Sequence, residues 1–376
     1  MENKKKKVIV GLSGGVDSAV SVIRLLQEGY DVEAMFMRNW DSAANNDLMG
    51  NPTVNDEVCP QELDYQDAKA VADKLGVKLH RVDFIEEYWD NVFEYFLEEY
   101  RKNRTPNPDI LCNKEIKFKA FLNKAEELGA DYIAMGHYAR VIHDGDKNYL
   151  LRGLDSNKDQ TYFLSQLSSK QLARALFPIG DMQKKDVRAL AAKYDLCVAN
   201  KKDSTGVCFI GERNFKEFLM NYIPANPGNI VDTQGNIKGR HDGVMYYTIG
   251  QRHGLGIGGP GEAWFVCGKN TLKNELIVGQ GEETELLYAN RVIVRGVNFI
   301  NEKVPSGTQL TAKFRYRQPD VDIKIYWIDD TTCEVRTLEP SKAITPGQAC
   351  VFYDGEYCLG GGTIDEVYMD DVKRNY

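Results

Sequence analysis

Residues 11–18, which read Gly-Leu-Ser-Gly-Gly-Val-Asp-Ser, limit what this chain can fold into more than any other stretch. They follow the apolar run 8–10 and precede apolar residues at helical spacing, which predicts a strand, a glycine turn and the start of a helix. Glycines let backbone N–H groups approach a phosphate, and a helix N-terminus adds its dipole and unpaired donors. The stretch therefore predicts a phosphate-binding loop.

Two other phosphate loops do not match this stretch. No Gly-Lys-Ser/Thr follows the glycines, as the Walker pattern requires, and the three-glycine spacing of dinucleotide loops is absent. Ser13 and Ser18 can donate hydroxyl hydrogen bonds, while Asp17 can hold a Mg²⁺-bound water or cap the helix. A simple glycine turn with a polar cap explains the whole string poorly. The string resembles the pyrophosphate-binding loop of the ATP pyrophosphatase superfamily, whose members split ATP between its α and β phosphates.

The N-terminal half of the chain alternates between strand and helix patterns. Buried-strand runs at 8–10, 32–36 and 131–135 are separated by helical stripes of apolar residues. This alternation predicts an α/β fold with a parallel sheet and helices on both faces. Ligands of such sheets lie beyond the C-terminal ends of the strands, where the phosphate loop, Met37 and Gly136 fall.

The pattern changes near Pro224, where helical stripes give way to short β-branched runs between glycines. We predict an ATP-binding catalytic domain at 1–213, a small mostly-β central domain at 214–286 and a C-terminal β-barrel at 287–376. Residues 41–62 are polar, irregular and long for a connection between a strand and a helix, which predicts a disordered segment or a lid.

Charge and cysteine content exclude several classes of protein. The net charge of −8 argues against bulk attraction to nucleic acid, although basic groups such as 101–104 and 315–317 can form local surfaces. We find no apolar run of membrane length and no signal peptide, so we expect a cytoplasmic protein without membrane contact. The 8 cysteines contain no Cys-x-x-Cys pair, so neither zinc nor an iron–sulfur cluster is expected.

Two cysteines stand where thiol chemistry is plausible. Cys112 follows a proline-punctuated loop at the expected start of a helix, with Lys114 and Lys117 nearby, which should lower its pKa and favour the thiolate. Asp109 can act as a base or bind a substrate. Cys208 is flanked by apolar residues typical of a strand. Taken alone, each cysteine is more often a small buried hydrophobe than a functional group.

Several strings together resemble one family, the bacterial tRNA-specific 2-thiouridylases, and they run in family order over nearly the whole chain. They include Arg-Thr-Pro-Asn-Pro-Asp-Ile-Leu-Cys-Asn-Lys-Glu-Ile-Lys-Phe at 104–118 and Asp-Ser-Thr-Gly-Val-Cys-Phe-Ile-Gly at 203–211. The other matching strings are residues 11–18, 36–40, 136–140, 158–164, 247–252, 313–317 and 343–348. The chain departs from the family pattern mainly within 41–62.

The resemblance implies a role for each matching position. The ATP site would comprise Gly11, Leu12, Ser13, Gly14, Gly15, Val16, Asp17, Ser18, Met37 and Gly136. Cys208 would carry a persulfide and Cys112 would be its partner nucleophile. Residues that would face the target uridine are Asn107, Pro108 and Asp109. Residues that would contact tRNA, some of them in the C-terminal barrel, are His137, Lys158, Asp159, Gln160, Arg315, Tyr316 and Gln348.

The expected reaction replaces the C2 oxygen of the wobble uridine, at position 34 of the tRNA, by sulfur. ATP would place AMP on that oxygen and make it a good leaving group. Mg²⁺ would accompany ATP, with Asp17 as a candidate contact and no metal ligand assigned. A sulfur-donor or relay protein would load Cys208, whose persulfide either attacks C2 or is cleaved by Cys112 to release sulfide; both routes stay open. Closing a disulfide would account for the remaining oxidising equivalent.

Two other functions are compatible with the phosphate loop. Another adenylating ligase with this loop would need no thiol, so it should survive Cys112→Ser. A non-enzymatic, ATP-gated RNA-binding protein would bind nucleotide without turnover, so it should release no pyrophosphate when tRNA is added.

Overall fold

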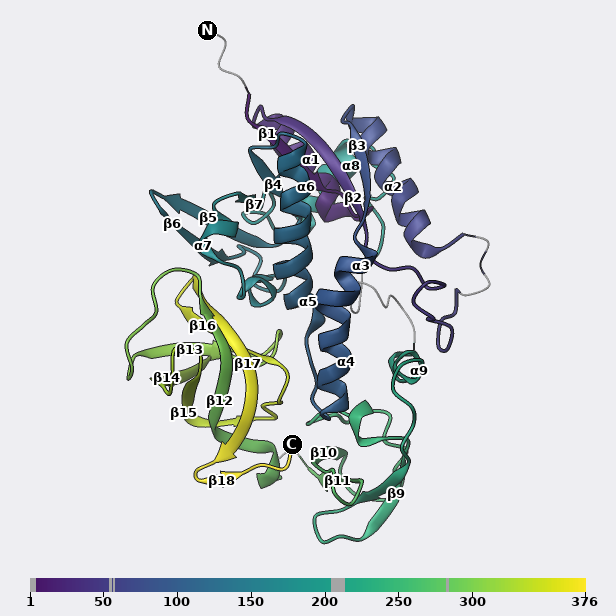
Figure 1. Cartoon of the computed structure of the whole chain (residues 1–376), viewed down its shortest axis with the longest axis vertical. Coiled ribbons are helices and arrows are strands. Elements are labelled where there is room, and N and C mark those ends of the chain that lie inside the picture. The colour runs from purple at the N-terminus through teal and green to yellow at the C-terminus, as the bar shows by residue number, and fades with distance from the viewer. Residues whose placement is uncertain (1–4, 54–55, 57, 204–213, 282–283) are drawn as a thin grey trace. The chain divides into compact units, whose positions relative to one another are not determined.

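The computed structural model describes residues 5–53, 56, 58–203, 214–281 and 284–376, which form two compact units. The first unit comprises Met1–Phe93, Pro108–Phe218 and Glu356–Leu359. The second comprises Glu94–Asn107, Leu219–Gly355 and Gly360–Tyr376. Figure 1 colours the chain along its length, so the first unit is mostly purple to teal and the second mostly green to yellow. Domain limits at 213 and 286 stay a prediction.

A five-stranded parallel sheet forms the centre of the first unit, in the order β3-β2-β1-β4-β7. Its strands are β1 (Lys7–Gly11), β2 (Asp31–Arg38), β3 (Leu79–Asp83), β4 (Tyr132–Ala134) and β7 (Ala175–Leu176). The central strand β1 lies between β2 and β4, with Val8 opposite both Val32 and Tyr132. The predicted parallel sheet is therefore confirmed.

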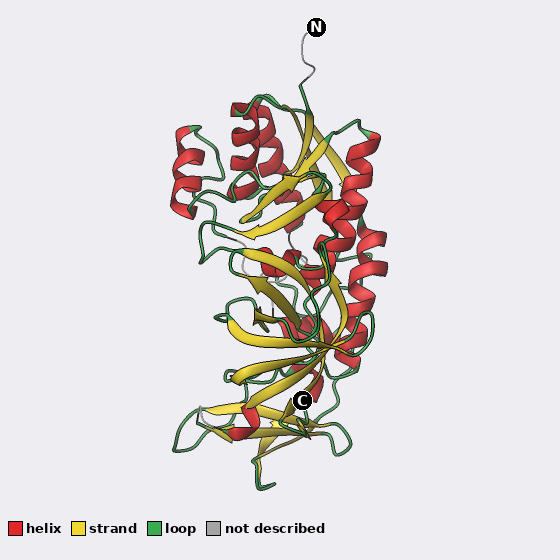
Figure 2. Cartoon of the chain, turned by 90° about the vertical axis from the view of Figure 1, so that its left-hand side faces the viewer, coloured by secondary structure: helices red, strands yellow, loops and turns green. Residues whose placement is uncertain are grey.

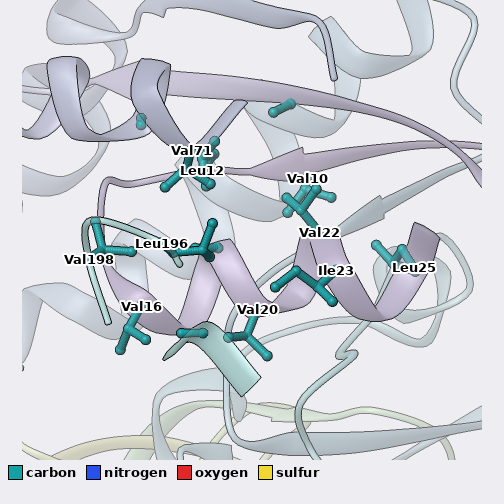
Figure 3. Packing of buried hydrophobic residues seen from close by; sticks show 14 of the residues in the cluster. Val10, Leu12, Val16, Val20, Val22, Ile23, Leu25, Val71, Leu196 and Val198 are labelled. Carbon is teal, nitrogen blue, oxygen red and sulfur yellow. The ribbon is translucent and has the colours of Figure 1, made fainter. Parts of the chain in front are cut away.

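Apolar side chains cover both faces of this sheet. The principal helices of the unit are α1 (Val16–Gln27), α2 (Pro60–Leu75), α6 (Phe121–Glu127) and α8 (Lys184–Lys193). Val8 and Val10 belong to one apolar cluster with residues of α1, α2 and α8, part of which Figure 3 shows around Val20 and Val71. Ile9 points to the opposite face, because side chains alternate along a strand, and it is fully buried too.

Shorter elements complete the first unit. They are α3 (Ile85–Tyr88), the π-helix η1 (Trp89–Phe93), α5 (Pro108–Leu111), the π-helix η2 (Cys112–Ala120), β5 (Ala139–Asp144), β6 (Lys147–Arg152), the 3₁₀ helix η3 (Thr161–Leu164) and α7 (Ser169–Leu172). Among the helices that the structure describes, none is long and apolar enough to cross a lipid bilayer.

The described part of the segment 41–62 packs around a buried carboxylate. Asp47 is fully buried and accepts a hydrogen bond of 3.0 Å from the indole Nε1 of Trp40. The side chain of Asn45 accepts the backbone N–H of Asp41 at 3.0 Å. Residues 41–53 therefore form a folded connection held by local hydrogen bonds. The polar composition of the segment alone did not predict these bonds.

The second unit consists mostly of strands, which Figure 2 draws in yellow. A four-stranded sheet has the order β10-β11-β8-β9. A separate antiparallel sheet, in the order β12-β15-β14-β13-β16-β17, closes into a barrel through pairing of β12 with β17. The predicted mostly-β domain and C-terminal barrel are thus confirmed. The first residues of β17 belong to the first unit, where Tyr357 pairs with Leu151 of β6.

The elements of the second unit begin with α4 (Glu94–Arg101), and α9 (Phe215–Met220) spans its limit with the first unit. The four-stranded sheet consists of β8 (Gly228–Val231), β9 (Ile237–His241), β10 (Trp264–Asn270) and β11 (Glu275–Gln280). The barrel region contains β12 (Tyr288–Phe299), β13 (Gln309–Lys313), β14 (Val321–Trp327), β15 (Cys333–Lys342), β16 (Ala349–Asp354), β17 (Tyr357–Met369) and β18 (Val372–Lys373). Two 3₁₀ turns are η4 (Val244–Tyr246) and η5 (Glu285–Leu287).

Candidate nucleotide-binding and catalytic site

The glycine loop connects β1 to α1 at the C-terminal edge of the parallel sheet. Gly14 has a φ of +78°, and a Cβ there would lie 2.3 Å from the carbonyl oxygen of Asp64, so only glycine fits. Gly15 is the N-cap of α1, and no side chain caps this helix. The backbone N–H groups of the first turn are therefore placed to receive an anion.

The remaining loop residues hold this backbone in place. Leu12 is fully buried and Val16 nearly so, which anchors both ends of the loop in the apolar core. The hydroxyl of Ser18 donates to the carbonyl of Gly15 at 3.0 Å and accepts the backbone N–H of Ser13 at 3.2 Å. The two serine hydroxyls also lie 3.2 Å apart. Ser13 and Ser18 thus brace the loop in addition to offering hydroxyls.

Asp17 at the start of α1 is paired with a lysine that is distant in sequence. Nζ of Lys184, the first residue of α8, lies 2.7 and 2.8 Å from the two carboxylate oxygens of Asp17. The hydroxyl of Tyr138 donates to the same carboxylate at 2.8 Å. Burial, followed by the negative charge of Asp17, raises the pKa of Tyr138, so this hydroxyl keeps its proton. The fold therefore places a lysine beside the loop.

Small or flexible residues from neighbouring strands meet beside the loop. A Cβ on Gly136 would lie 2.8 Å from the backbone nitrogen of Ser18. A Cβ on Gly11 would lie 2.7 Å from the sulfur of Met135 and 3.6 Å from the terminal carbon of Met37. The sheet thus brings the predicted ATP residues Gly11, Met37 and Gly136 to one edge, and a side chain at either glycine would crowd it.

A second lysine, Lys201, connects the loop backbone to two carboxylates of α2. Nζ of Lys201 donates to the carbonyl oxygen of Gly14 at 3.0 Å and to the carboxylates of Asp64 and Asp67 at 2.7 and 2.6 Å. Burial lowers the pKa of Lys201, but the hydrogen bonds to both carboxylates outweigh it and leave the pKa raised. Lys201 therefore remains charged and fixes the glycine turn.

His137 lies next to this site as a neutral imidazole. Its side chain is buried between the rings of Phe118 and Phe177, whose centroids are 6.1 and 6.0 Å away. Burial, reinforced by the charge of Lys117, holds the pKa of His137 well below its usual range. Nδ1 of His137 has no hydrogen-bond partner among the described residues. The ring can therefore offer a neutral nitrogen to an incoming polar group.

The predicted tRNA residues at 158–160 serve different structural purposes. Gln160 accepts the backbone N–H of Tyr138 through its side chain at 3.0 Å. Asp159 is buried and accepts hydrogen bonds from Gly153 and Thr161, so its carboxylate holds a turn. Lys158 is half-buried and forms a 2.7 Å ion pair with Asp203.

Cys112 lies further into its helix than the sequence indicated. The helical run begins at Pro108 in α5 and continues directly into η2, whose first residue is Cys112. Proline is favoured in a first helical turn, which explains the earlier start. The open N–H groups of the helix therefore lie nearer to Asp109, and the expectation that they act on Cys112 is corrected. The side chain of Cys112 is 1% exposed.

The other predicted residues are distributed between the two units. Asn107, Arg315, Tyr316 and Gln348 belong to the second unit, whereas Pro108 and Asp109 belong to the first. The guanidinium of Arg315 donates to the carbonyl of Ile249 at 2.5 Å and to the hydroxyl of Thr345 at 2.6 Å. Gln348 donates to the carbonyl of Thr105 at 2.7 Å. Cys208 lies outside the described residues.

Sequence reasoning missed Lys184 and the role of Tyr138. Lys184 lies 167 residues from Asp17, and no local pattern marks it, whereas Tyr138 stands within one of the strings that carry the family resemblance. Among the residues that the structure describes, no group of three or more His, Cys, Asp or Glu side chains could hold a metal ion.

Three family models match the chain in consecutive segments. They are a tRNA methyl transferase HUP domain at residues 6–212, a tRNA methyl transferase PRC-barrel domain at 216–280 and an aminomethyltransferase β-barrel domain at 289–364. A tRNA-specific 2-thiouridylase of Acholeplasma laidlawii is 58% identical over 375 residues, covering 99% of this chain and 100% of that protein. One of Enterococcus faecalis is 55% identical over 383 residues, covering 100% and 99%. A solved 4-thiouridine synthetase in complex with RNA and ATP is 17% identical with a TM-score of 0.34, covering 55% of this chain and 46% of that chain.

Proposed function

This chain belongs to the tRNA-specific 2-thiouridylase family, and we propose that it uses ATP to replace the C2 oxygen of the wobble uridine of tRNA, at position 34, by sulfur. The observation that carries the ATP-dependent half of this proposal is the uncapped glycine loop, with Lys184 and Asp17 beside it. The family model that matches the first domain is named for methyl transfer, whereas the relatives that match the whole chain are named for 2-thiouridine. A glycine loop with open N–H groups at a helix N-terminus is an anion site, which favours an ATP-dependent reaction.

In this proposal the loop receives the β and γ phosphates of ATP. The open N–H groups of α1 bind their oxygens, and Lys184 turns from Asp17 towards the charge that develops on the leaving pyrophosphate. The uridine O2 attacks the α phosphorus, the bond to the β phosphate breaks, and AMP remains on the tRNA. Met37 and Gly136 border the same edge of the sheet and would contact the nucleotide.

Mg²⁺ fits this arrangement through Asp17. Carboxylates are preferred Mg²⁺ ligands, and Asp17 offers two oxygens at the start of the anion-binding helix. Lys184 now neutralises both oxygens, so its movement towards a phosphate would free them for the ion. Bound Mg²⁺ would neutralise phosphate charge; Tyr138 would continue to orient the carboxylate.

The sulfur-transfer half rests on the two cysteines. A donor protein would form a persulfide on Cys208, and its terminal sulfur would attack C2 and displace AMP. The thiolate of Cys112 would then attack the Cys208 sulfur, releasing 2-thiouridine and leaving a Cys112–Cys208 disulfide. Alternatively, Cys112 attacks the persulfide first, and the released sulfide displaces AMP. Either route ends in the same disulfide, which a cellular dithiol must reduce.

Asp109 and its neighbours complete the proposed base site. Asp109 lies in the first turn of the helix that contains Cys112 and would take the proton from N3 or orient the uracil edge. Asn107 and Pro108 would contact the same base. His137, Lys158, Gln160, Arg315, Tyr316 and Gln348 would contact the tRNA, with Asp159 supporting that surface through its turn. The protein would work in the cytoplasm, where thiols stay reduced.

A labelled-nucleotide experiment tests this function. With α-labelled ATP, Mg²⁺ and tRNA, the wild-type protein should yield AMP on tRNA and one pyrophosphate per adenylated uridine, with no labelled ADP. With a persulfide donor, mass spectrometry should then find 2-thiouridine. Cys208→Ala should stop sulfur insertion and leave AMP transfer intact, because AMP transfer needs only the loop and the base site. Labelled ADP, or normal sulfur insertion by the variant, would contradict the proposal.

A further inference from the structure

The carboxylate of Asp203 collects three cations. Nζ of Lys158 lies 2.7 Å from one oxygen, while Nζ of Lys184 and Nη2 of Arg188 each lie 2.8 Å from the other. Burial raises the pKa of Asp203, but the hydrogen bonds from Lys158 and Lys184 outweigh it and lower the pKa to about 2. Asp203 is therefore ionised at physiological pH and is held from several directions.

The chain just before Asp203 is tied to the nucleotide loop at further points. Arg188 donates to the carbonyl oxygens of Ala199 and Lys201 at 2.9 and 3.0 Å. Lys201 in turn donates to the carbonyl of Gly14 in the loop. Lys184, which binds Asp203, also binds Asp17. These bonds join the chain before Asp203 to the loop through several side chains at once, whereas a single exposed ion pair contributes little.

On the C-terminal side of Cys208, the described residues from Asn214 to Phe218 are fixed in the same unit. Phe218 is fully buried, and its ring centroid lies 6.2 Å from that of Trp40 and 6.1 Å from that of Phe93. Gly50 packs so closely on this stretch that a Cβ would lie 2.6 Å from Cβ of Glu217 and 3.0 Å from the carbonyl of Asn214. Both described flanks of the stretch containing Cys208 are thus anchored in the unit that holds the nucleotide loop.

We infer that Asp203 is a positioning residue for sulfur transfer, an inference that rests on the proposed function. Asp203 stands five residues before Cys208 in the sequence and pairs with Lys184. Lys184 also pairs with Asp17 at the nucleotide loop. The adenylated uridine and the persulfide must meet in one place, and small errors in the position of reacting groups cost roughly 100-fold in rate. Asp203 thereby ties the chain that bears the sulfur to the loop that activates the oxygen.

The test separates AMP transfer from sulfur insertion in Asp203→Asn. A single-turnover reaction contains α-labelled ATP, tRNA and Cys208 loaded by a cysteine desulfurase with cysteine. AMP–tRNA should form within about threefold of the wild-type rate, because the substitution removes neither Lys184 nor Asp17 nor any N–H group of the loop. In contrast, 2-thiouridine should form at least about tenfold more slowly, so that AMP–tRNA accumulates. Asp73→Asn, an exposed acid of α2, is the matched control and should behave as wild type.

Each other outcome has a definite meaning. If AMP transfer and sulfur insertion fall together, or neither falls, Asp203 does not position the sulfur carrier. Melting temperatures of both variants verify that they fold, and Asp203→Glu, which keeps the charge, should recover part of the sulfur insertion if the inference holds; no recovery contradicts it. If the wild-type protein itself forms no AMP–tRNA, the proposed function fails, and this result is distinct from a failure of the inference.

Discussion

The nucleotide loop and the C-terminal barrel both carry many charged side chains, but they use them differently. Beside the loop, the largely buried Lys184 bridges Asp17 and Asp203. On the barrel, Arg336 pairs with Glu334 at 2.6 Å and Lys373 with Glu366 at 2.5 Å, and the side chains of both cations are more than half exposed. Exposed ion pairs are solvated by water and contribute little to the free energy of unfolding. Removing one partner of a buried pair is costly, because it leaves the other charge buried without a partner.

The barrel cysteines sharpen this contrast between the two regions. Burial raises the pKa of Cys333 to about 12 and also raises that of Cys350 well above its usual range. These thiols stay protonated at neutral pH, and only thiolates are effective nucleophiles. Cys333 and Cys350 are therefore poor nucleophiles. We expect substitutions around the loop to affect catalysis more than substitutions in the barrel interior.

The largest effect is expected from Gly14→Ala. The new Cβ would meet the carbonyl of Asp64 at 2.3 Å, so the loop must move together with several N–H donors. Because each such donor is worth on the order of 100-fold in rate, AMP transfer should fall by more than about 1,000-fold. Gly129→Ala is a matched control, because Gly129 has the same φ of +78° with no atom within 4 Å of a Cβ. A pyrophosphate-release assay should find it near wild type; equal activity of both variants would refute the role of the loop.

Lys184→Gln should reduce AMP transfer by about 100-fold, because one charge that stabilises the leaving pyrophosphate is lost. Binding of inorganic pyrophosphate, measured by isothermal titration calorimetry, should weaken in the same variant, while tRNA affinity stays unchanged. The neighbouring exposed residue provides the control Lys185→Gln, which should match wild type in both measurements. Unchanged pyrophosphate affinity in Lys184→Gln would remove Lys184 from the phosphate site.

A pH effect is expected in the second unit, where Lys269 is buried and donates to the carbonyl of Asn103 at 2.7 Å. Burial lowers the pKa of Lys269 from 10.5 to about 7. Between these values the unfolded chain binds a proton that the folded chain does not, so the free energy of unfolding should rise with pH across this window. Urea unfolding at about pH 7.5 and about pH 9.5 measures the difference.

The variant Lys269→Met should flatten this pH dependence, whereas Lys273→Met, at an exposed position of the same region, should retain it. AMP transfer should change little with Lys269→Met, because the residue lies outside the loop. A pH profile of stability identical in wild type and Lys269→Met would show that Lys269 does not titrate in this window.

The smallest effect is expected from Arg315→Ala, which should weaken tRNA binding several-fold and reduce the salt slope of binding by about one unit if Arg315 contacts a phosphate. Arg336→Ala removes an arginine from the exposed barrel surface and serves as control. Filter binding at several salt concentrations measures both quantities. Because Arg315 already donates to Ile249 and Thr345, a drop in affinity without a change in slope would identify a structural role.

Local patterns were sufficient for the architecture of both regions. The apolar run at 8–10, followed by glycines and a helical stripe, correctly predicted β1, the loop and α1, because these elements depend on short-range hydrogen bonds and side-chain periodicity. The same reasoning predicted the parallel sheet, the mostly-β region and the barrel. It misplaced the start of the helix containing Cys112, because Pro108 opens that helix a turn earlier than the proline-rich string indicated.

The surroundings of the loop were beyond such patterns, because partners far apart in sequence meet only when the chain is packed. Asp17 receives Tyr138 from 121 residues away and Lys184 from 167 residues away. Their pairing depends on how β4 and α8 lie against α1, and no spacing in the sequence encodes that placement. The neutral state of His137 likewise follows from its burial between two aromatic rings. The sequence motif was therefore sufficient to predict a phosphate loop. The lysines beside it, Lys184 and Lys201, could be identified only from the packed fold.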